Sequence, residues 1–369
     1  VNTRLLIKNK LDGIGRYSFE VLKRIVKTNP KIEFHFIFDR PFSSDFIFAD
    51  NIKTHILQPP ARHPVLWYIW FEIQLPRLIN RIKPNVFFSP DGFMSIKLHN
   101  IPTVITMHDI NFEHRPDDLH WLHSLYYRTY FKKYAHLSTH IITVSEFSKK
   151  DIMTNYQVSK NKITVAYNGV GNNFQPIQKD KQVIIKKKYS NQKDFFLFIG
   201  SLHKRKNIKN LLLAFDMYRP KGENKLLIIG KKKWWDKQTE KVYEHMKYKE
   251  DVIFIGQIND ELMVNILASS KALCFVSIFE GFGLPIIEAM KCHVPVITSS
   301  TSSMPEIAGN AALIVDPHNI SEIYNAMIQI DQNPQLCADL IQKGQQIIQK
   351  FQWNNTAHVI SETLLKHAK

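Results

Sequence analysis

The sequence predicts an α/β protein built from two doubly wound halves, each a parallel sheet covered by helices on both faces. The chain has 369 residues, more than one hydrophobic core usually organises. Short β-branched segments alternate with longer stretches of helical spacing, as in parallel sheets with crossover helices. This alternation breaks near residues 170–190, where a glycine- and asparagine-rich turn precedes Pro176 and a lysine-rich segment. We therefore expect two domains, residues 1–172 and 173–351.

Eleven short apolar segments are the predicted strands. In the first half they are residues 32–38, 85–89, 103–107, 140–144 and 163–167, and in the second half residues 195–200, 226–230, 252–256, 272–276, 294–299 and 312–315. Residues 1–4 resemble the end of a further strand, with its beginning missing. Helical spacing fills most of the intervals, for example residues 15–28 and 207–218.

Composition excludes several classes of protein. Hydrophobic residues make up 44% and charged residues 22%, which is typical of a soluble globular protein. No apolar run approaches the roughly 20 residues that span a bilayer, and there is no signal-peptide pattern. The three cysteines, Cys274, Cys292 and Cys337, are widely spaced and are expected to be reduced thiols. These features predict a cytosolic protein.

The net charge of +16 is concentrated in one part of the chain, because residues 173–250 hold 20 Lys and Arg against 8 Asp and Glu. Such an excess suits phosphate-bearing ligands or an anionic membrane surface, and a solvated basic face is the plain alternative. Nothing resembles a nucleic-acid module, so no nucleic-acid partner is expected.

The most informative segment is Phe-Glu-Gly-Phe-Gly-Leu-Pro-Ile-Ile-Glu-Ala-Met, residues 279–290. Two glycines free the backbone ahead of Pro285, which suits the first turn of a helix. A helix N-terminus attracts phosphate, so Glu280 can face a sugar while Glu288, eight positions later, accepts hydrogen bonds from a ribose diol. For an isolated pair, the alternative is a capping Glu280 and a solvent-facing Glu288.

Further segments accompany this one along the chain. They are residues 13–17, His108-Asp109, 144–148, 168–170, 200–207, 295–298 and 304–309. These segments follow one another as they do in glycosyltransferase family 4, the retaining nucleotide-sugar glycosyltransferases of GT-B fold. On this basis the chain resembles that family. That resemblance implies two Rossmann-like domains facing across a cleft, with a helix at residues 352–369 packing back on the N-terminal domain.

The resemblance also implies roles for individual residues. Lys206 matches the family's lysine, and Arg205 replaces an arginine more often found at the position of Ser201. With His108 and Glu280 they form the expected catalytic set. The expected donor-binding residues are Gly13, Gly15, Ser201, Gly281, Phe282, Gly283, Leu284 and Glu288. No metal or other cofactor is expected, since Arg205 and Lys206 can supply a cation's charge.

The expected activity is retaining transfer of a hexose, with mannose preferred, from a nucleotide diphospho-sugar to a glycan or lipid-linked acceptor in cell-surface polysaccharide synthesis. Peripheral contact with the inner membrane surface is a further expectation. A nucleotide-sugar 2-epimerase of the same fold and a non-catalytic nucleotide-sugar-binding subunit are the alternatives.

Residues 66–71, a dense aromatic run, are expected in the core, or else at an acceptor groove or membrane. The lysines at 231–233 are a solvated run or a weak steering charge.

Overall fold

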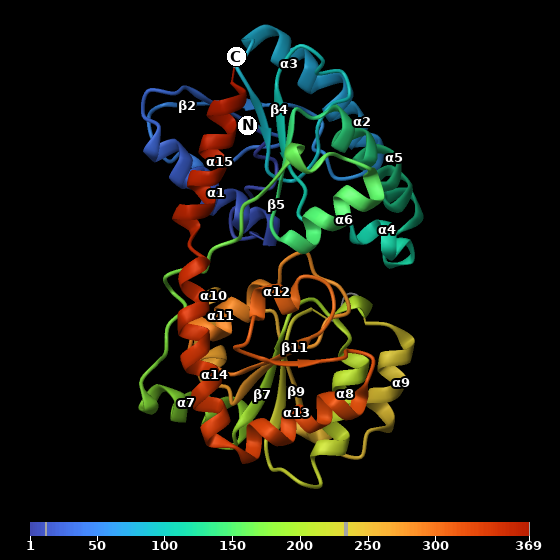
Figure 1. Cartoon of the computed structure of the whole chain (residues 1–369), viewed down its shortest axis with the longest axis vertical. Coiled ribbons are helices and arrows are strands. Elements are labelled where there is room, and N and C mark those ends of the chain that lie inside the picture. The colour runs from blue at the N-terminus through green and yellow to red at the C-terminus, as the bar shows by residue number, and fades with distance from the viewer. Residues whose placement is uncertain (12, 232–234, 369) are drawn as a thin grey trace. The chain divides into compact units, whose positions relative to one another are not determined.

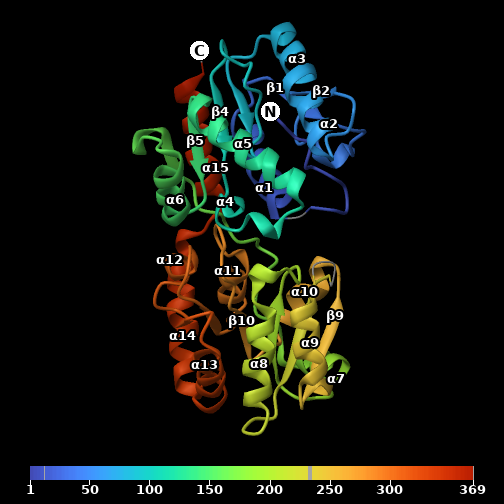
Figure 2. The same cartoon turned by 90° about the vertical axis from the view of Figure 1, so that its right-hand side faces the viewer.

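The computed structural model describes residues 1–11, 13–231 and 235–368. Its internal contacts divide the chain into two units. The first comprises Val1–Gly169 and Gln352–Lys369, and the second comprises Val170–Phe351. Each unit is an α/β layer structure in which helices flank parallel strands (Figures 1 and 2). The predicted lysine run extends beyond the described residues, which include Lys231 but neither Lys232 nor Lys233.

The second unit contains one six-stranded parallel sheet in the order β12-β11-β10-β7-β8-β9. Its strands are β7 (Phe195–Ile199), β8 (Lys225–Ile229), β9 (Val252–Gly256), β10 (Ala272–Phe275), β11 (Val296–Ser299) and β12 (Leu313–Val315). This order is that of a doubly wound nucleotide-binding sheet, in which the chain changes direction between the two central strands. Here those strands are β7 and β10, and ligands bind such sheets beyond the carboxyl ends of the central strands.

Helices cover both faces of this sheet. They are α7 (Lys179–Ser190), α8 (Ile208–Tyr218), α9 (Lys237–His245), α10 (Asp260–Leu267), α11 (Leu284–Lys291), α12 (Met304–Ala308), α13 (Ile320–Gln332) and α14 (Pro334–Ile347). The strands are almost entirely apolar, since a sheet covered on both faces exposes neither side to water. A buried cluster around Phe196, Leu211 and Ile297 forms the core.

The first unit is also α/β, but its parallel strands form two sheets. Its strands are β1 (Phe34–Phe38), β2 (Ile52–Ile56), β3 (Phe87–Ser89), β4 (Thr103–Thr106), β5 (His140–Thr143) and β6 (Ile163–Val165). Backbone hydrogen bonds from Asn2 N to Phe88 O (2.9 Å) and from Thr3 N to Ile37 O (3.0 Å) place the first residues between β3 and β1. The strand end expected at residues 1–4 is present only as a single parallel bridge between Asn2 and Ile37. β1 and β2 form a two-stranded sheet, and the other strands form a four-stranded sheet in the order β3-β4-β5-β6.

The helices of the first unit include one from the far end of the sequence. They are α1 (Gly13–Thr28), α2 (Pro64–Ile69), α3 (Leu75–Ile82), α4 (Asn111–His114), α5 (Trp121–Leu137), α6 (Glu146–Tyr156) and α15 (Trp353–His367). α15 packs along α1, and Figure 1 shows the two side by side. The ring of Trp353 fits closely against the backbone of Gly169, where a Cβ would lie 2.6 Å from the Trp353 ring atom Cγ.

One strand was missed in the sequence, and one aromatic segment can be compared with its expected place. The strand β2 was not predicted, because only Ile52 and Ile56 in it are apolar and it lies at the exposed edge of the sheet. The aromatic run at residues 66–71 lies mainly in the core, as expected. Trp67, Trp70 and Phe71 are buried in the core, as the packing interpretation required, whereas Tyr68 is exposed.

Candidate active site

The predicted site residues of the second unit gather where doubly wound sheets bind ligands. Arg205 and Lys206 lie in a short 3-10 turn, Lys204–Lys206, that follows β7. Glu280 lies in the loop that follows β10. Because β7 and β10 are neighbours in the sheet, the two segments meet at its carboxyl edge although they are about 75 residues apart in the sequence.

The two segments are fastened to each other by hydrogen bonds. Ile278 N donates to Arg205 O at 2.7 Å, and the side chain of Asn207 donates to Val276 O at 3.0 Å. Asn207 adopts the left-handed conformation (φ 58°), which ends the turn and starts α8. The cations are therefore held on a rigid turn and not on a free loop.

Glycines keep this edge of the sheet open. β7 and β8 are each followed directly by a glycine, Gly200 and Gly230. A Cβ at Gly230 would lie 1.8 Å from the carbonyl oxygen of Gly200, so no other residue fits there without displacing the backbone. Ser201 follows this contact and is exposed. Its carbonyl accepts a hydrogen bond from His203 N at 2.8 Å.

Glu280 pairs with both predicted cations. Its Oε1 lies 2.5 Å from Lys206 Nζ and its Oε2 lies 2.9 Å from an Arg205 guanidinium nitrogen. Burial alone would raise the pKa of this carboxyl, but the charges of Arg205 and Lys206 lower it to about 2. The group is thus ionised at neutral pH, and the three side chains together carry one net positive charge.

Lys206 is the more enclosed of the two cations. Its side chain is 10% exposed against 27% for that of Arg205. Its ammonium also lies 4.9 Å from the ring centroid of Phe275, a cation–π contact. The guanidinium of Arg205 donates to Phe279 O at 2.9 Å. A buried lysine held by a carboxylate and a ring has a fixed position, as electrostatic stabilisation of a reacting group requires.

The loop after Glu280 leads into α11 as the sequence predicted. Gly283 has a φ of 100° at the N-cap of this helix, and Pro285 lies in its first turn. Gly281 and Phe282 are buried, and Leu284 is half-buried at the first helical position. The phenyl ring of Phe282 makes an edge contact with Phe351, with centroids 5.6 Å apart.

The alternative interpretation of the two glutamates, a capping Glu280 and a solvent-facing Glu288, is wrong. Glu280 does not cap α11, whose N-cap is Gly283 without a side-chain hydrogen bond. Glu288 is not solvent-facing, since it is only 9% exposed. It lies on the inner side of α11, because a helix residue one turn before the buried Cys292 shares its face.

Two serines in this site escaped the sequence analysis. Ser302 Oγ accepts a hydrogen bond from Glu280 N at 3.0 Å. Ser303 Oγ lies 2.9 Å from Glu280 O and 2.9 Å from Phe282 O, donating to these carbonyls. They hold the backbone on either side of Glu280. The run of serine and threonine at 298–303, placed between β11 and α12, was the available signal.

The remaining predicted residues belong to the first unit. His108 follows β4, and its Nε2–H donates to Pro90 O at 2.9 Å. In the neutral ring this leaves Nδ1 as the hydrogen-bond acceptor, which suits a sugar hydroxyl. Tyr17 makes an edge contact with the imidazole at 4.6 Å between centroids, and its hydroxyl lies 3.1 Å from Thr106 Oγ1. Tyr17 is therefore a further residue that positions His108.

The glycines near the start of the chain do not form a separate loop. α1 begins at Gly13, so Gly13 and Gly15 lie in its first turn. The helix expected from residue 15 therefore begins two residues earlier. Glycine lowers helix stability, but here it does so only in the first turn. A Cβ at Gly13 would meet no atom within 4 Å. Asp109 accepts a hydrogen bond at 2.9 Å from Asn111 N, at the first residue of α4, whose N-cap is Ile110.

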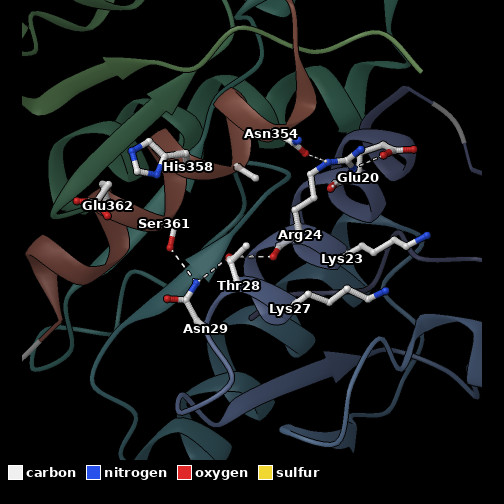
Figure 3. A pocket seen from close by; sticks show the side chains of 11 residues that line it. Glu20, Lys23, Arg24, Lys27, Thr28, Asn29, Asn354, His358, Ser361 and Glu362 are labelled. Carbon is white, nitrogen blue, oxygen red and sulfur yellow. Dashed lines mark hydrogen bonds and ion pairs between the residues drawn. The ribbon is translucent and has the colours of Figure 1, made fainter. Parts of the chain in front are cut away.

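A pocket of about 610 Å³ lies away from these residues, between α1 and α15 (Figure 3). Arg24 crosses it to Asn354 Oδ1 at 2.8 Å, and Asn29 donates to Ser361 Oγ at 3.1 Å. It contains none of the predicted site residues, and its contacts fix α15 to α1.

Among the described residues, no group of three or more His, Cys, Asp or Glu is arranged to hold a metal ion. Within the same residues, no helix is long and apolar enough to cross a membrane.

Known proteins resemble both units. The family model described as Glycosyltransferase Family 4 matches residues 11–172, and the model described as Glycosyl transferases group 1 matches residues 180–347. O-antigen chain mannosyltransferase B of Escherichia coli is 26% identical over 371 residues, covering 95% of this chain and 94% of that protein. O-antigen chain mannosyltransferase RfbU of Salmonella typhimurium is 27% identical over 323 residues, covering 85% and 83%.

Among solved structures, HepE of Anabaena in complex with UDP and glucose aligns with a TM-score of 0.75. It is 16% identical, and the alignment covers 97% of each chain. This match confirms the GT-B fold that the sequence predicted, with two Rossmann-like domains.

Proposed function

This chain belongs to glycosyltransferase family 4, and we propose that it is a retaining enzyme that transfers a hexose from a nucleotide diphospho-sugar. The preferred sugar is mannose, because the two relatives named above are O-antigen mannosyltransferases that match most of their length. The acceptor is a hydroxyl of a glycan or lipid-linked glycan in the synthesis of a cell-surface polysaccharide. The enzyme acts at the cytoplasmic face of the membrane.

The observation that carries the proposal is the group formed by Arg205, Lys206 and Glu280 at the switch point of the second sheet. Loss of a nucleoside diphosphate places growing negative charge on the departing phosphate. A fixed ammonium and a guanidinium stabilise that charge more strongly than they stabilise the intact donor. They also supply the positive charge that a divalent cation would supply, so we propose that the reaction uses no metal.

The other residues receive roles from their surroundings. Glu288, buried on α11, accepts hydrogen bonds from the ribose diol of the nucleotide. The first turn of α11 and the backbone of residues 281–284 approach the diphosphate. His108 accepts a hydrogen bond from the transferred sugar through Nδ1, and Gly13 and Gly15 allow a close approach at the start of α1. Ser201 is proposed to contact the donor from the edge of the sheet.

A donor screen followed by a transfer assay tests the proposal. Thermal shift with UDP-, GDP-, ADP- and dTDP-sugars should reveal one donor class that stabilises the protein. The expected gain is roughly 3–4 kcal/mol at 100 to 1,000 times the dissociation constant. With acceptor, free nucleotide and glycosylated product should appear together. An epimerised donor formed without acceptor would identify an isomerase instead, and absence of any shift would refute the donor site.

The role of Lys206 has its own test. We expect Lys206→Ala to lower kcat roughly 100- to 1,000-fold, the effect of removing one preorganised charge stabiliser. The matched control is Lys209→Ala, which removes a lysine from the first turn of the neighbouring helix α8 and should change kcat little. If Lys206→Ala changes only KM, the lysine is a docking charge and does not act on the leaving group.

A further inference from the structure

The outer side of α5 is an exposed stripe that combines apolar and cationic side chains. Trp121 is 65% exposed and Leu125 is 59% exposed, which is unusual for side chains of this size. Arg128 and Lys132 continue the stripe at the spacing of one helix face and are also exposed. Figures 1 and 2 both show α5 on the outside of the first unit, with no other helix over its outer side.

The helix α5 itself contributes no acidic group to this face. The whole of α5, Trp121–Leu137, contains no Asp or Glu, whereas it contains one arginine, two lysines and two histidines. Asp117 is exposed in the turn that precedes the helix. Glu113 lies beside α5, but Tyr156 donates a hydrogen bond to its carboxylate at 2.9 Å and Arg128 lies 3.3 Å from it. Glu113 offsets the charge of Arg128, so the net positive charge of the stripe comes from Lys132.

The beginning of α2 extends the same surface. The ring of His63, at the N-cap of α2, lies 6.1 Å from that of His123 in the first turn of α5. Val65 and Tyr68, three residues apart on α2, are both exposed. Trp67 lies between them and points inward. Its ring packs edge-on against that of His123, with 5.2 Å between the ring centroids. One side of this helix pair thus builds the core, and the other side exposes valine, tyrosine, tryptophan and leucine.

We infer that this surface, Val65, Tyr68, Trp121, Leu125, Arg128 and Lys132, rests on the headgroup region of an anionic lipid bilayer. Tryptophan and tyrosine favour the boundary between water and hydrocarbon, and leucine adds apolar area that the boundary covers. Lysine and arginine beside them are attracted by anionic lipids. The inference gives the proposed membrane contact a defined location, and it concerns a surface separate from the residues assigned to the donor.

A second helix provides the comparison. On α7, Val183 and Ile184 are exposed to a similar degree, 61% and 63%, and lysines surround them. This helix lacks tryptophan, its single tyrosine is at the far end, and Asp180 lies in its first turn. Because Trp and Tyr are the side chains typical of a membrane boundary, we assign the contact to α5 and use α7 as the control.

Co-sedimentation with vesicles tests the assignment on the full chain. We expect binding to equal parts phosphatidylglycerol and phosphatidylethanolamine, weaker binding to phosphatidylcholine alone, and a decrease with added salt. Leu125→Ala should lower the partition coefficient about ten-fold, from the lost apolar area. Lys132→Gln should lower it about five-fold, from one lost charge. Ile184→Ala should leave it unchanged.

Several results would overturn the inference. They are absence of binding to the anionic vesicles, loss of binding in Ile184→Ala but not in Leu125→Ala, and sedimentation without vesicles that Leu125→Ala abolishes. The last result would show that α5 binds a second copy of the chain. Circular dichroism checks that the variants fold, as expected for exposed positions. Donor binding by Leu125→Ala, measured by thermal shift, should equal that of the parent, so failure of the membrane surface and failure of the proposed donor site are distinguishable.

Discussion

Glu280→Gln is the substitution with the clearest physical consequences, because it removes one charge and keeps the shape of the side chain. In the parent, the carboxylate contacts Lys206 and Arg205 at 2.5 Å and 2.9 Å in a buried setting. Its pKa falls from the usual 4.5 to about 2. At about 1.4 kcal/mol per pKa unit, the folded state favours the ionised form by about 3 kcal/mol.

That difference sets the expected loss of stability. Unfolding of the second unit by denaturant at pH 7 should show Glu280→Gln less stable by about 3 kcal/mol, in line with the effect of breaking a buried pair. In the parent, the pKa of Glu280 is lowered on folding. Its contribution is therefore complete above the unfolded value of 4.5 and is lost as the pH falls toward 2. The variant should lack this acid-sensitive component.

Binding should change in the opposite direction. Without the carboxylate, the charge of the cluster rises from one to two, so inorganic pyrophosphate should bind about ten-fold more tightly by calorimetry, or about 1.4 kcal/mol. The transfer rate should nevertheless fall, since Glu280 is assigned to the catalytic set. Glu240→Gln, at an exposed carboxylate on α9 of the same unit, is the matched control. If both variants match the parent in stability, in pH profile and in pyrophosphate affinity, the pairing has no energetic importance.

Three further predictions test other parts of the molecule. Glu288→Gln should weaken free nucleotide and intact donor together by roughly 1.5–3 kcal/mol in calorimetry, and unchanged nucleotide affinity in a folded variant would contradict the ribose role. Trp353→Ala should lower the unfolding free energy of the first unit by about 3–5 kcal/mol, because Trp353 is 4% exposed and packs on Gly169 and Tyr17; a variant as stable as the parent would show that the helix is not anchored there. Burial raises the pKa of Cys292 to about 12 and that of Cys274 further above its usual range, so a thiol reagent at neutral pH should modify half-buried Cys337 first. Equal labelling rates of all three native thiols would contradict this order.

The alternation of strands and helices was predictable because each buried strand has its own local signature. β7 and β10 are apolar throughout, β8 is apolar after Lys225, and turn residues follow all three strands. β2 lacked that signature, because most of its side chains are exposed and its composition is like that of a polar loop. The start of α1 was misplaced because Gly13 and Gly15 disfavour a helix locally, and packing of the following turns outweighs that preference.

The sequence proposed the members of the candidate site, but it could not show which of their side chains pair. The residues came from motifs, and each motif lies in one segment. Which side chains touch depends on the sheet order, which places the turn after β7 against the loop after β10. No local pattern states that order. For the same reason Ser302 and Ser303 escaped notice, although they hold the backbone at Glu280 by three hydrogen bonds.

The pairing of Glu280 with both cations explains how the second unit can hold two positive charges ready for a diphosphate. Arg205 and Lys206 are adjacent in one turn, so without a counter-charge they would repel each other and the turn would be less well fixed. Glu280 supplies that counter-charge, and the carbonyl of Phe279 and the ring of Phe275 complete the surroundings. In the proposed reaction, a diphosphate would meet cations that are already oriented, so little reorganisation would be needed when the leaving group departs. Such an arrangement favours rate over affinity, which is why we expect Glu280→Gln to bind pyrophosphate more tightly and to transfer sugar more slowly.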